Sequence, residues 1–212
     1  TAGTIFEQGG QTFKYIGVNL RGVRHYGRGD ALPYSQLSDV DLNLSEIDAM
    51  GGKVIRSFVA YNGIDAQQAG DRLQYVLDRM APLGITMIAA LTDFYATPFH
   101  PQGDDNYYEQ DLNGYTVLNH EWYASGYQNN YQPFVQALVT RFADHPGIFA
   151  WELGNEIKDA SFANSDPNTF IAFCHTMAQF IRGLDTNHLI TVGLISVPNA
   201  GLSQTQGQTL FG

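Results

Sequence analysis

Cysteine and positive charge are what this sequence has least of. One cysteine, Cys174, stands among 212 residues, so the chain can form neither an internal disulfide framework nor a cysteine-based zinc site. Eleven basic residues stand against twenty-one acidic ones, and the net charge of −10 argues against nucleic acid or an anionic membrane as a partner. No apolar run reaches the roughly 18 residues of a membrane span. We expect an extracellular, secreted protein that binds no nucleic acid and no membrane.

Nucleotide and metal motifs are also missing. No G-x-G-x-x-G follows the first predicted strand and no G-x-x-x-x-G-K-[S/T] occurs, which argues against a nucleotide-binding protein. No group of histidines and carboxylates has metal-ligand spacing, so we predict no metal and no cofactor. The hydrophobic content of 44% is that of a globular chain and excludes a disordered one. We expect a single domain over residues 1–212.

Strand-like and helix-like segments alternate along the chain. A short hairpin is predicted around Gly9-Gly10. Five strands are predicted at 14–19, 53–59, 85–91, 148–153 and 189–195, and helical faces lie between them at 40–47, 73–80, 134–142 and 170–184. Asp166 and Pro167 form an N-cap and first helical residue. The tail after Pro198 shows no strong element.

The alternation predicts an α/β fold in which helices cover a parallel sheet. Two architectures fit five strands, namely an open doubly wound sheet and a partial (β/α)8 barrel. The segment from Thr92 to Tyr131 shows no clean period and is rich in tyrosine. An irregular stretch of that length in a compact domain is usually functional.

Functional side chains of parallel α/β folds gather at the carboxyl ends of the strands. The predicted strand ends carry a polar and aromatic set that includes two carboxylates. In chain order its members are Asn19, His25, Tyr26, Asn62, Asp93, Tyr95, Asn155 and Glu156. We therefore expect the functional site at these strand ends.

The fourth predicted strand is the most informative segment. Because side chains alternate across a strand, Phe149, Trp151 and Leu153 share one face, which suits packing under helices. Glu152 and Glu156 share the other face, which suits a barrel interior with Glu156 at its top. The buried charge of Glu152 needs a partner, and Arg56 on the second strand is the natural one.

The run Trp151-Glu-Leu-Gly-Asn-Glu156 resembles the end of the fourth strand in clan A glycoside hydrolases, which include family 5 cellulases and β-mannanases. Three other segments resemble the family in the same order: the hairpin that leads into Gly17-Val18-Asn19, Arg56 on strand two, and Arg141 to Pro146 before strand four. The order of these segments is slightly more mannanase-like.

The resemblance implies a (β/α)8 barrel and retaining hydrolysis of β-1,4-linked polysaccharides by two glutamates. It assigns the acid/base role to Glu156 and contact with the sugar 2-hydroxyl to Asn155. The second glutamate, the nucleophile, belongs to strand seven, and no residue here matches it. We therefore expect a barrel that is incomplete at the C-terminus and negligible activity of the chain alone.

Other residues are given substrate contacts as hypotheses. His25 and Tyr26 either contact sugar or pack a loop, and Asn62 and Arg56 are placed beside the substrate. Tyr95 and Trp122 are the preferred aromatic platforms for a pyranose face. Asp93 is either a corner hydrogen-bonding group or a substrate contact; as an inverting partner of Glu156 it is the weaker alternative.

Two non-enzymatic readings compete with hydrolysis. The first is a sugar-binding protein on a half-barrel, and the second is an assembly protein whose sheet edges, at 14–19 and 189–195, pair with another chain. The partners expected are therefore a polysaccharide or oligosaccharide and, at the edges, either a second copy or the C-terminal half of the barrel.

Overall fold

The computed structural model describes residues 7–8, 10–20, 37–60, 64–95, 106–159 and 165–211. Its centre is a parallel sheet of five strands: β3 (Ile16–Asn19), β4 (Gly52–Phe58), β5 (Thr86–Ala90), β8 (Ile148–Glu152) and β9 (Leu189–Thr191). All five predicted strands are confirmed, with ends that differ by a few residues. An N-terminal hairpin pairs β1 (Glu7–Gln8) with β2 (Gln11–Thr12), as the Gly9-Gly10 signal predicted.

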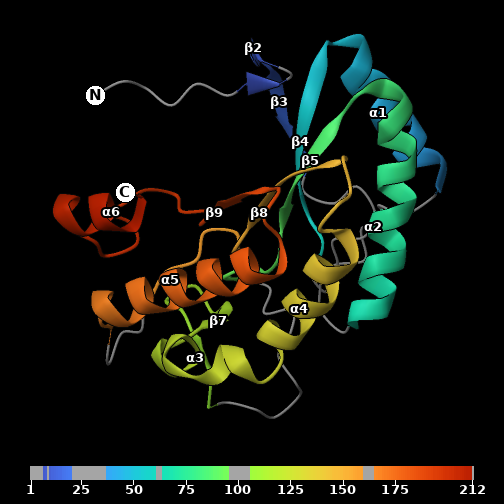
Figure 1. Cartoon of the computed structure of the whole chain (residues 1–212). Helices are drawn as coiled ribbons and strands as arrows, with labels where there is room; N and C mark the ends of the chain where they lie inside the picture. Colours follow the sequence, from blue (N-terminus) through green and yellow to red (C-terminus); the bar gives the residue numbers. More distant parts are fainter. Residues whose placement is uncertain are drawn as a thin grey trace.

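The strands lie in the order β3-β4-β5-β8-β9, which is their order along the chain. A doubly wound sheet reverses its strand order at a switch point, whereas a barrel adds each strand beside the last. The order therefore excludes the doubly wound alternative and shows a partial barrel. The four long helices lie along one side of the sheet, and the short C-terminal helix lies outside their row (Figure 1).

Four long helices cover the outer face of the sheet. They are α1 (Leu37–Ala49), α2 (Ala66–Met80), α4 (Tyr131–Phe142) and α5 (Pro167–Leu184). Their apolar faces pack with outward-facing strand residues such as Ile55 and Trp151 in one core. Asp166 caps α5 by accepting the Asn168 N–H at 3.0 Å, as predicted. A 3-10 turn, η1 (Ala81–Leu83), connects α2 to β5.

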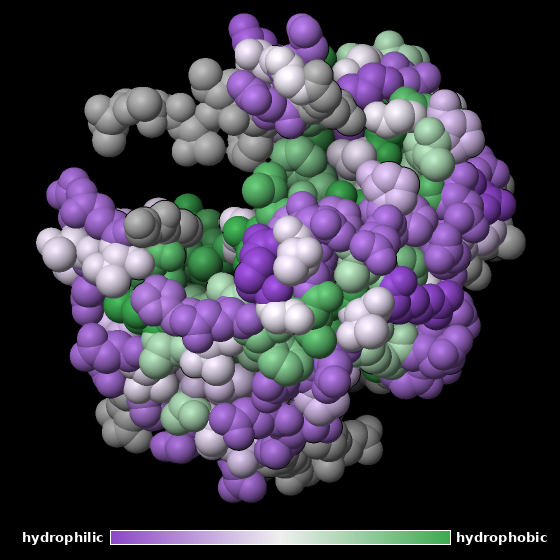
Figure 2. Space-filling view, viewed as in Figure 1, coloured by the Kyte–Doolittle hydropathy of each residue, from purple (hydrophilic) through white to green (hydrophobic). Residues whose placement is uncertain are grey.

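The inner face of the sheet is much less filled. Side chains in register across the parallel strands form two rows, one of which is Arg56, Ile88, Ala150 and Leu189, and the other Phe58, Ala90, Glu152 and Thr191. Among the described residues, Phe58 and Ala90 form a small buried apolar cluster there that is separate from the main core. Leu189, on the outermost strand, is 43% exposed. Figure 2 shows hydrophobic surface in the recess between the sheet and the C-terminal helix.

Two segments differ from the sequence prediction. The irregular stretch contains a hairpin of β6 (Tyr108–Gln110) and β7 (Thr116–Leu118), then α3 (His120–Ala124) and a 3-10 turn, η2 (Gly126–Gln128). The tail forms α6 (Gln204–Phe211), which packs against α5, so the expectation of no strong element there was wrong. No helix among the described residues is both long and apolar enough to span a bilayer.

Candidate active site

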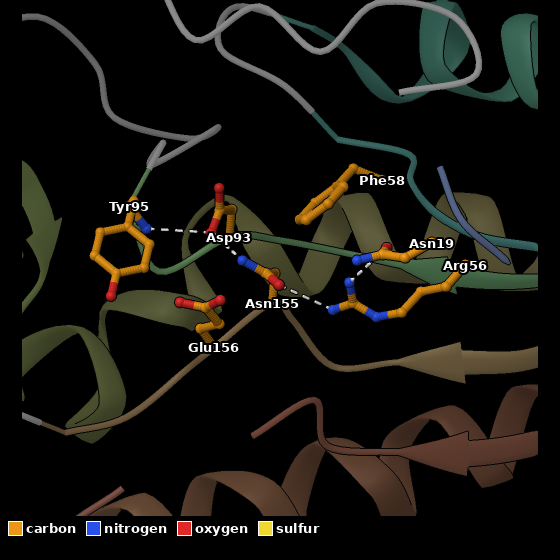
Figure 3. A pocket seen from close by; sticks show the side chains of 7 residues that line it. All are labelled: Asn19, Arg56, Phe58, Asp93, Tyr95, Asn155 and Glu156. Atoms are coloured by element: carbon orange, nitrogen blue, oxygen red, sulfur yellow. Dashed lines mark hydrogen bonds between the residues drawn. The ribbon is translucent and has the colours of Figure 1, made fainter. Parts of the chain in front are cut away.

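A pocket of about 230 Å³ opens at the carboxyl ends of four neighbouring strands. Its lining consists of seven residues: Asn19, Arg56, Phe58, Asp93, Tyr95, Asn155 and Glu156. They come from the end of β3, from β4, and from the segments that follow β5 and β8 (Figure 3). Five of the residues predicted from sequence, Arg56, Asp93, Tyr95, Asn155 and Glu156, therefore meet in one cavity.

Arg56 organises the floor of this pocket. Its Nε donates to Glu152 Oε2 at 2.8 Å, and its Nη2 donates both to Glu152 Oε1 and, at 2.9 Å, to Asn155 Oδ1. Nη1 donates to Asn19 Oδ1 at 3.2 Å. The predicted pairing of Glu152 with Arg56 is thus confirmed, and the forked guanidinium fixes the orientation of the Asn155 amide.

Asn155 is held from its other side by Asp93. The amide Nδ2 of Asn155 donates to Asp93 Oδ1 at 3.0 Å, and the backbones of the two residues form a parallel bridge. Asp93 is 1% exposed. With Oδ1 engaged by Asn155, Asp93 serves as a corner hydrogen-bonding group, which was one of its three predicted roles.

Glu156 has an unusual backbone. Its φ of +53° makes it the one residue other than glycine in the left-handed region among the described parts of the chain. Such a conformation costs on the order of 1–3 kcal/mol and persists where surrounding contacts impose it. Here the Glu156 N–H donates to Gly193 O at 2.7 Å. Gly193 itself has a φ of +87°, and a Cβ there would collide with Gly154 O and the Glu152 carboxylate.

Tyr95 faces Glu156 across the pocket (Figure 3). Its backbone N–H donates to Asp93 Oδ1 at 3.3 Å. Burial, followed by the charge of the Glu156 carboxylate and a hydrogen bond to it, raises the pKa of the Tyr95 phenol. The phenol therefore stays protonated and serves as a hydrogen-bond donor at neutral pH.

Four further residues were predicted to belong to the site. His25, Tyr26 and Asn62 lie outside the described residues. Trp122 needs a correction, because it is 2% exposed and its ring packs against those of Tyr131 and Phe173 at centroid distances of 5.5 and 5.3 Å. A ring buried in the core offers no face to a sugar, so Trp122 is a packing residue.

Phe58 lines the pocket and was missed by the sequence analysis. The signal was present, because Phe58 follows Arg56 by two residues on the same strand and alternation places both on the same face. The predicted strand, 53–59, includes Phe58, but the side chain assigned to the site at its end is Asn62. Asn19 was noted as a strand end but not included among the substrate contacts.

The chemistry available is that of a carboxyl group beside an oriented amide. Two of the seven lining residues carry carboxyl groups, Asp93 and Glu156, and the Asp93 carboxylate is occupied by Asn155 and the Tyr95 N–H. Glu156 is partly exposed at the pocket wall. A carboxyl group in that position can transfer a proton to or from a bound ligand.

Comparison with known proteins places this site in context. A family model described as glycoside hydrolase family 5 β-mannosidase-like matches residues 104–205, which include Asn155 and Glu156. The mannan endo-1,4-β-mannosidase A of Podospora anserina is 26% identical over 91% of this chain and 52% of its own length. The mannan endo-1,4-β-mannosidase F of Aspergillus clavatus is 32% identical over 58% of this chain and 26% of its own length.

Solved structures share the fold. The endo-1,4-β-mannanase from Rhizomucor miehei superposes with a TM-score of 0.69 at 19% identity, over 92% of this chain and 60% of that structure. The endo-β-1,4-mannanase from Thermotoga petrophila gives a TM-score of 0.64 at 21% identity, over 86% of this chain and 43% of that structure. The chain spans about half the length of the Podospora anserina relative and about a quarter of that of the Aspergillus clavatus relative. The predicted resemblance to family 5 glycoside hydrolases of clan A, of the mannanase type, is confirmed.

Proposed function

We propose that this chain, a relative of the family 5 mannanases, carries the general-acid half of a retaining hydrolase for β-1,4-linked mannan. The observation that supports this most strongly is the placement of Glu156 and Asn155 together, at the end of the fourth barrel strand, in a pocket floored by Arg56. The sequence motif and the pocket geometry both support a role for these two residues.

In this proposal the lining residues have different roles. Glu156 protonates the glycosidic oxygen as the bond to the anomeric carbon breaks. Asn155 binds the hydroxyl next to that carbon, and Arg56 and Asp93 hold the Asn155 amide in position through the bonds at 2.9 and 3.0 Å. Phe58 and Tyr95 present ring faces and edges to the sugar.

A retaining mechanism also needs a nucleophilic carboxylate about 5–5.5 Å from the acid/base. None of the described residues fills that role, because Asp93 is engaged with Asn155. We therefore expect no measurable hydrolysis of mannan, carboxymethyl cellulose or aryl glycosides by the chain alone. A partner segment that supplies the carboxylate would dock on the open inner face and on the β9 edge, where Leu189 is exposed.

A small external nucleophile can replace a missing carboxylate and makes the proposal testable on the chain as it is. The substrate is 4-methylumbelliferyl β-mannobioside with sodium azide. Azide forms the new bond to the anomeric carbon while the aryl oxygen leaves and takes its proton from Glu156, giving α-mannobiosyl azide and the free fluorophore. We expect the azide-dependent rate of fluorophore release to fall about 10²-fold or more in Glu156→Gln.

The matched control is Glu46→Gln, the same change on the exposed face of α1. It should leave the azide-dependent rate unchanged. The catalytic assignment is wrong if the wild-type chain gives no azide-dependent product. It is also wrong if Glu156→Gln and Glu46→Gln release the fluorophore at the same azide-dependent rate. Retained binding of mannohexaose in that case, measured by calorimetry, would favour the alternative of a carbohydrate-binding protein. Secretion remains part of the proposal, since the acidic composition supports it.

A further inference from the structure

We propose that Tyr95 is the positioning residue for the Glu156 carboxyl group, and that the β6–β7 hairpin holds Tyr95 in place through Tyr115. The inference rests on the proposed function, because it assigns a partner to the proposed acid/base. It gives a role to part of the irregular segment that the sequence motif leaves unexplained.

The contact between the two side chains is direct. Tyr95 follows β5 and Glu156 follows β8, and both line the same pocket. In Figure 3 the phenol oxygen points toward the Glu156 carboxylate. Besides burial, the charge of that carboxylate and a hydrogen bond to it are among the causes that raise the pKa of the phenol. The backbone N–H of Glu156 donates to Gly193 O, a bond that holds the main chain but not the side chain.

Tyr95 is held at three points. Its N–H donates to Asp93 Oδ1 at 3.3 Å, and its ring meets the rings of Phe94 and Tyr115 edge to face, at centroid distances of 5.0 and 6.2 Å. Aromatic pairs in this edge-to-face geometry stabilise each other beyond the area they bury. The ring orientation is therefore set before any ligand enters.

The hairpin that carries Tyr115 is itself tied to the site. The Leu118 N–H donates to Phe94 O at 3.3 Å, which joins β7 to the residue before Tyr95. At the hairpin turn, Asp111 Oδ1 accepts the N–H groups of Asn113 and Tyr115 at 2.9 and 2.8 Å. A chain of contacts thus runs from the hairpin turn through Tyr115 and Tyr95 to Glu156.

The phenol has a chemical use at that place. When Glu156 gives its proton to the leaving oxygen, a carboxylate forms, and the Tyr95 O–H donates to this new negative charge without losing its own proton. The hydrogen bond is stronger to the carboxylate than to the neutral acid, so it stabilises the transition state more than the ground state. This stabilisation of the transition state is larger for a leaving group that needs more help from a proton to depart.

The first test needs no catalysis. Tyrosines labelled with carbon-13 at Cζ are titrated by NMR in the wild-type chain, in Glu156→Gln and in the control Glu46→Gln. We expect the pKa of Tyr95 to lie above its ordinary value of about 10 and to fall toward it in Glu156→Gln alone. Asp93 and Asp111 also raise it and are unchanged in all three proteins. An identical Tyr95 titration in the three proteins would overturn the proposal.

The second test separates positioning from folding. Azide-dependent cleavage is measured for 4-methylumbelliferyl and 2,4-dinitrophenyl β-mannobiosides in Tyr95→Phe, Tyr115→Ala and the control Tyr15→Phe, whose ring lies at the other end of the sheet. In Tyr95→Phe we expect about a tenfold loss for the poorer leaving group and less than twofold for the better one. Tyr115→Ala should show the same pattern with a smaller loss of rate. Tyr15→Phe should lose no rate with either substrate.

The outcomes distinguish this inference from the proposed function. Equal losses for both leaving groups in Tyr95→Phe, or no loss, would overturn the positioning role. A wild-type chain that cleaves neither substrate would refute the proposed function, and the tyrosine titration would then decide on its own whether Tyr95 holds Glu156. Circular dichroism of each variant identifies any that fails to fold, and for those the Glu156→Gln titration is the deciding measurement.

Discussion

Arg56→Met should be among the most damaging single substitutions at the site. It removes the guanidinium from Glu152, whose carboxylate is bound by two of its hydrogen bonds and whose side chain is only 5% exposed. The Glu152 charge then remains buried without a cationic partner. Methionine keeps much of the length and volume of the arginine stem, so the loss is that of the charge and its bonds.

The magnitude follows from the burial of the two partners. Breaking a buried ion pair by removing one partner costs about 3–5 kcal/mol. The Arg56 side chain is 23% exposed, which places this pair at the lower end, about 3 kcal/mol. For a chain of this length that corresponds to a fall in Tm of roughly 6–12 °C.

Glu152→Met should cost less than Arg56→Met. Arg56 keeps Asn155 and Asn19 as acceptors and some access to water, so we expect about 1.5 kcal/mol. In the double variant no charge is left buried, and its cost should fall below that of the two single variants together. The coupling energy from this cycle should be about 2 kcal/mol.

Urea unfolding at 25 °C and pH 7, followed by tryptophan fluorescence, measures all four proteins. Trp122 and Trp151 are both buried and report the unfolding of the core. Lys53→Met is the control, since the pair of Lys53 with Asp48 is 39% and 41% exposed and should be worth less than about 1 kcal/mol. If Arg56→Met costs no more than this control, or if the cycle is additive, the reasoning about the buried pair is wrong.

Two further predictions concern the surroundings of the pocket. The bond of His120 Nδ1 to Asp159 Oδ2 at 2.7 Å raises the pKa of His120, so its stabilising effect should be complete below pH about 6.5 and be lost as the pH rises through the folded-state value. Urea midpoints measured from pH 5.5 to 8.5 should show this loss of stability. The pH dependence should disappear in His120→Gln and persist in the control His175→Gln, on the exposed face of α5. An unchanged pH profile in His120→Gln would contradict the assignment. Gly193→Ala should lose about 2–3 kcal/mol in the same assay, because of its φ of +87° and the close approach of Gly154 O. Gly183→Ala, at a helical position with open space around it, should be neutral or stabilising, and equal effects of the two alanines would refute the argument from backbone geometry.

The parallel sheet was predictable because the spacing of apolar residues in each helix, and the apolar runs of the strands, can be recognised locally in the sequence. The apolar spacing of α2, α4 and α5 and the N-cap at Asp166 gave elements that the structure confirms. The pairing of Arg56 with Glu152 could be inferred because a buried carboxylate needs a cation and few were in reach. The helix α6 was missed because its residues are mostly polar and its stability comes from packing against α5.

Positions set by tertiary contact could not be predicted in the same way. Trp122 is a residue type that often stacks on sugars. Its packing against Phe173 and Tyr131 shows instead that it belongs to the core. The left-handed φ of Glu156 depends on Gly193, which belongs to the next strand segment. The contact of Tyr95 with Tyr115 depends on a hairpin whose strands are three residues each, too short to show a period.

The sequential strand order has a consequence for synthesis on the ribosome. Arg56 and Glu152 are separated by 96 positions, and translation adds about 5–20 residues per second. Arg56 therefore leaves the ribosome and waits roughly 5–20 s before its carboxylate partner has been made. During that interval β3, β4 and β5 can already pair in order, each beside its predecessor. Slowing the ribosome between α2 and β8 would lengthen the life of an intermediate with an unpaired arginine on its inner face, and in this chain that interval is a period of exposure to chaperones and proteases.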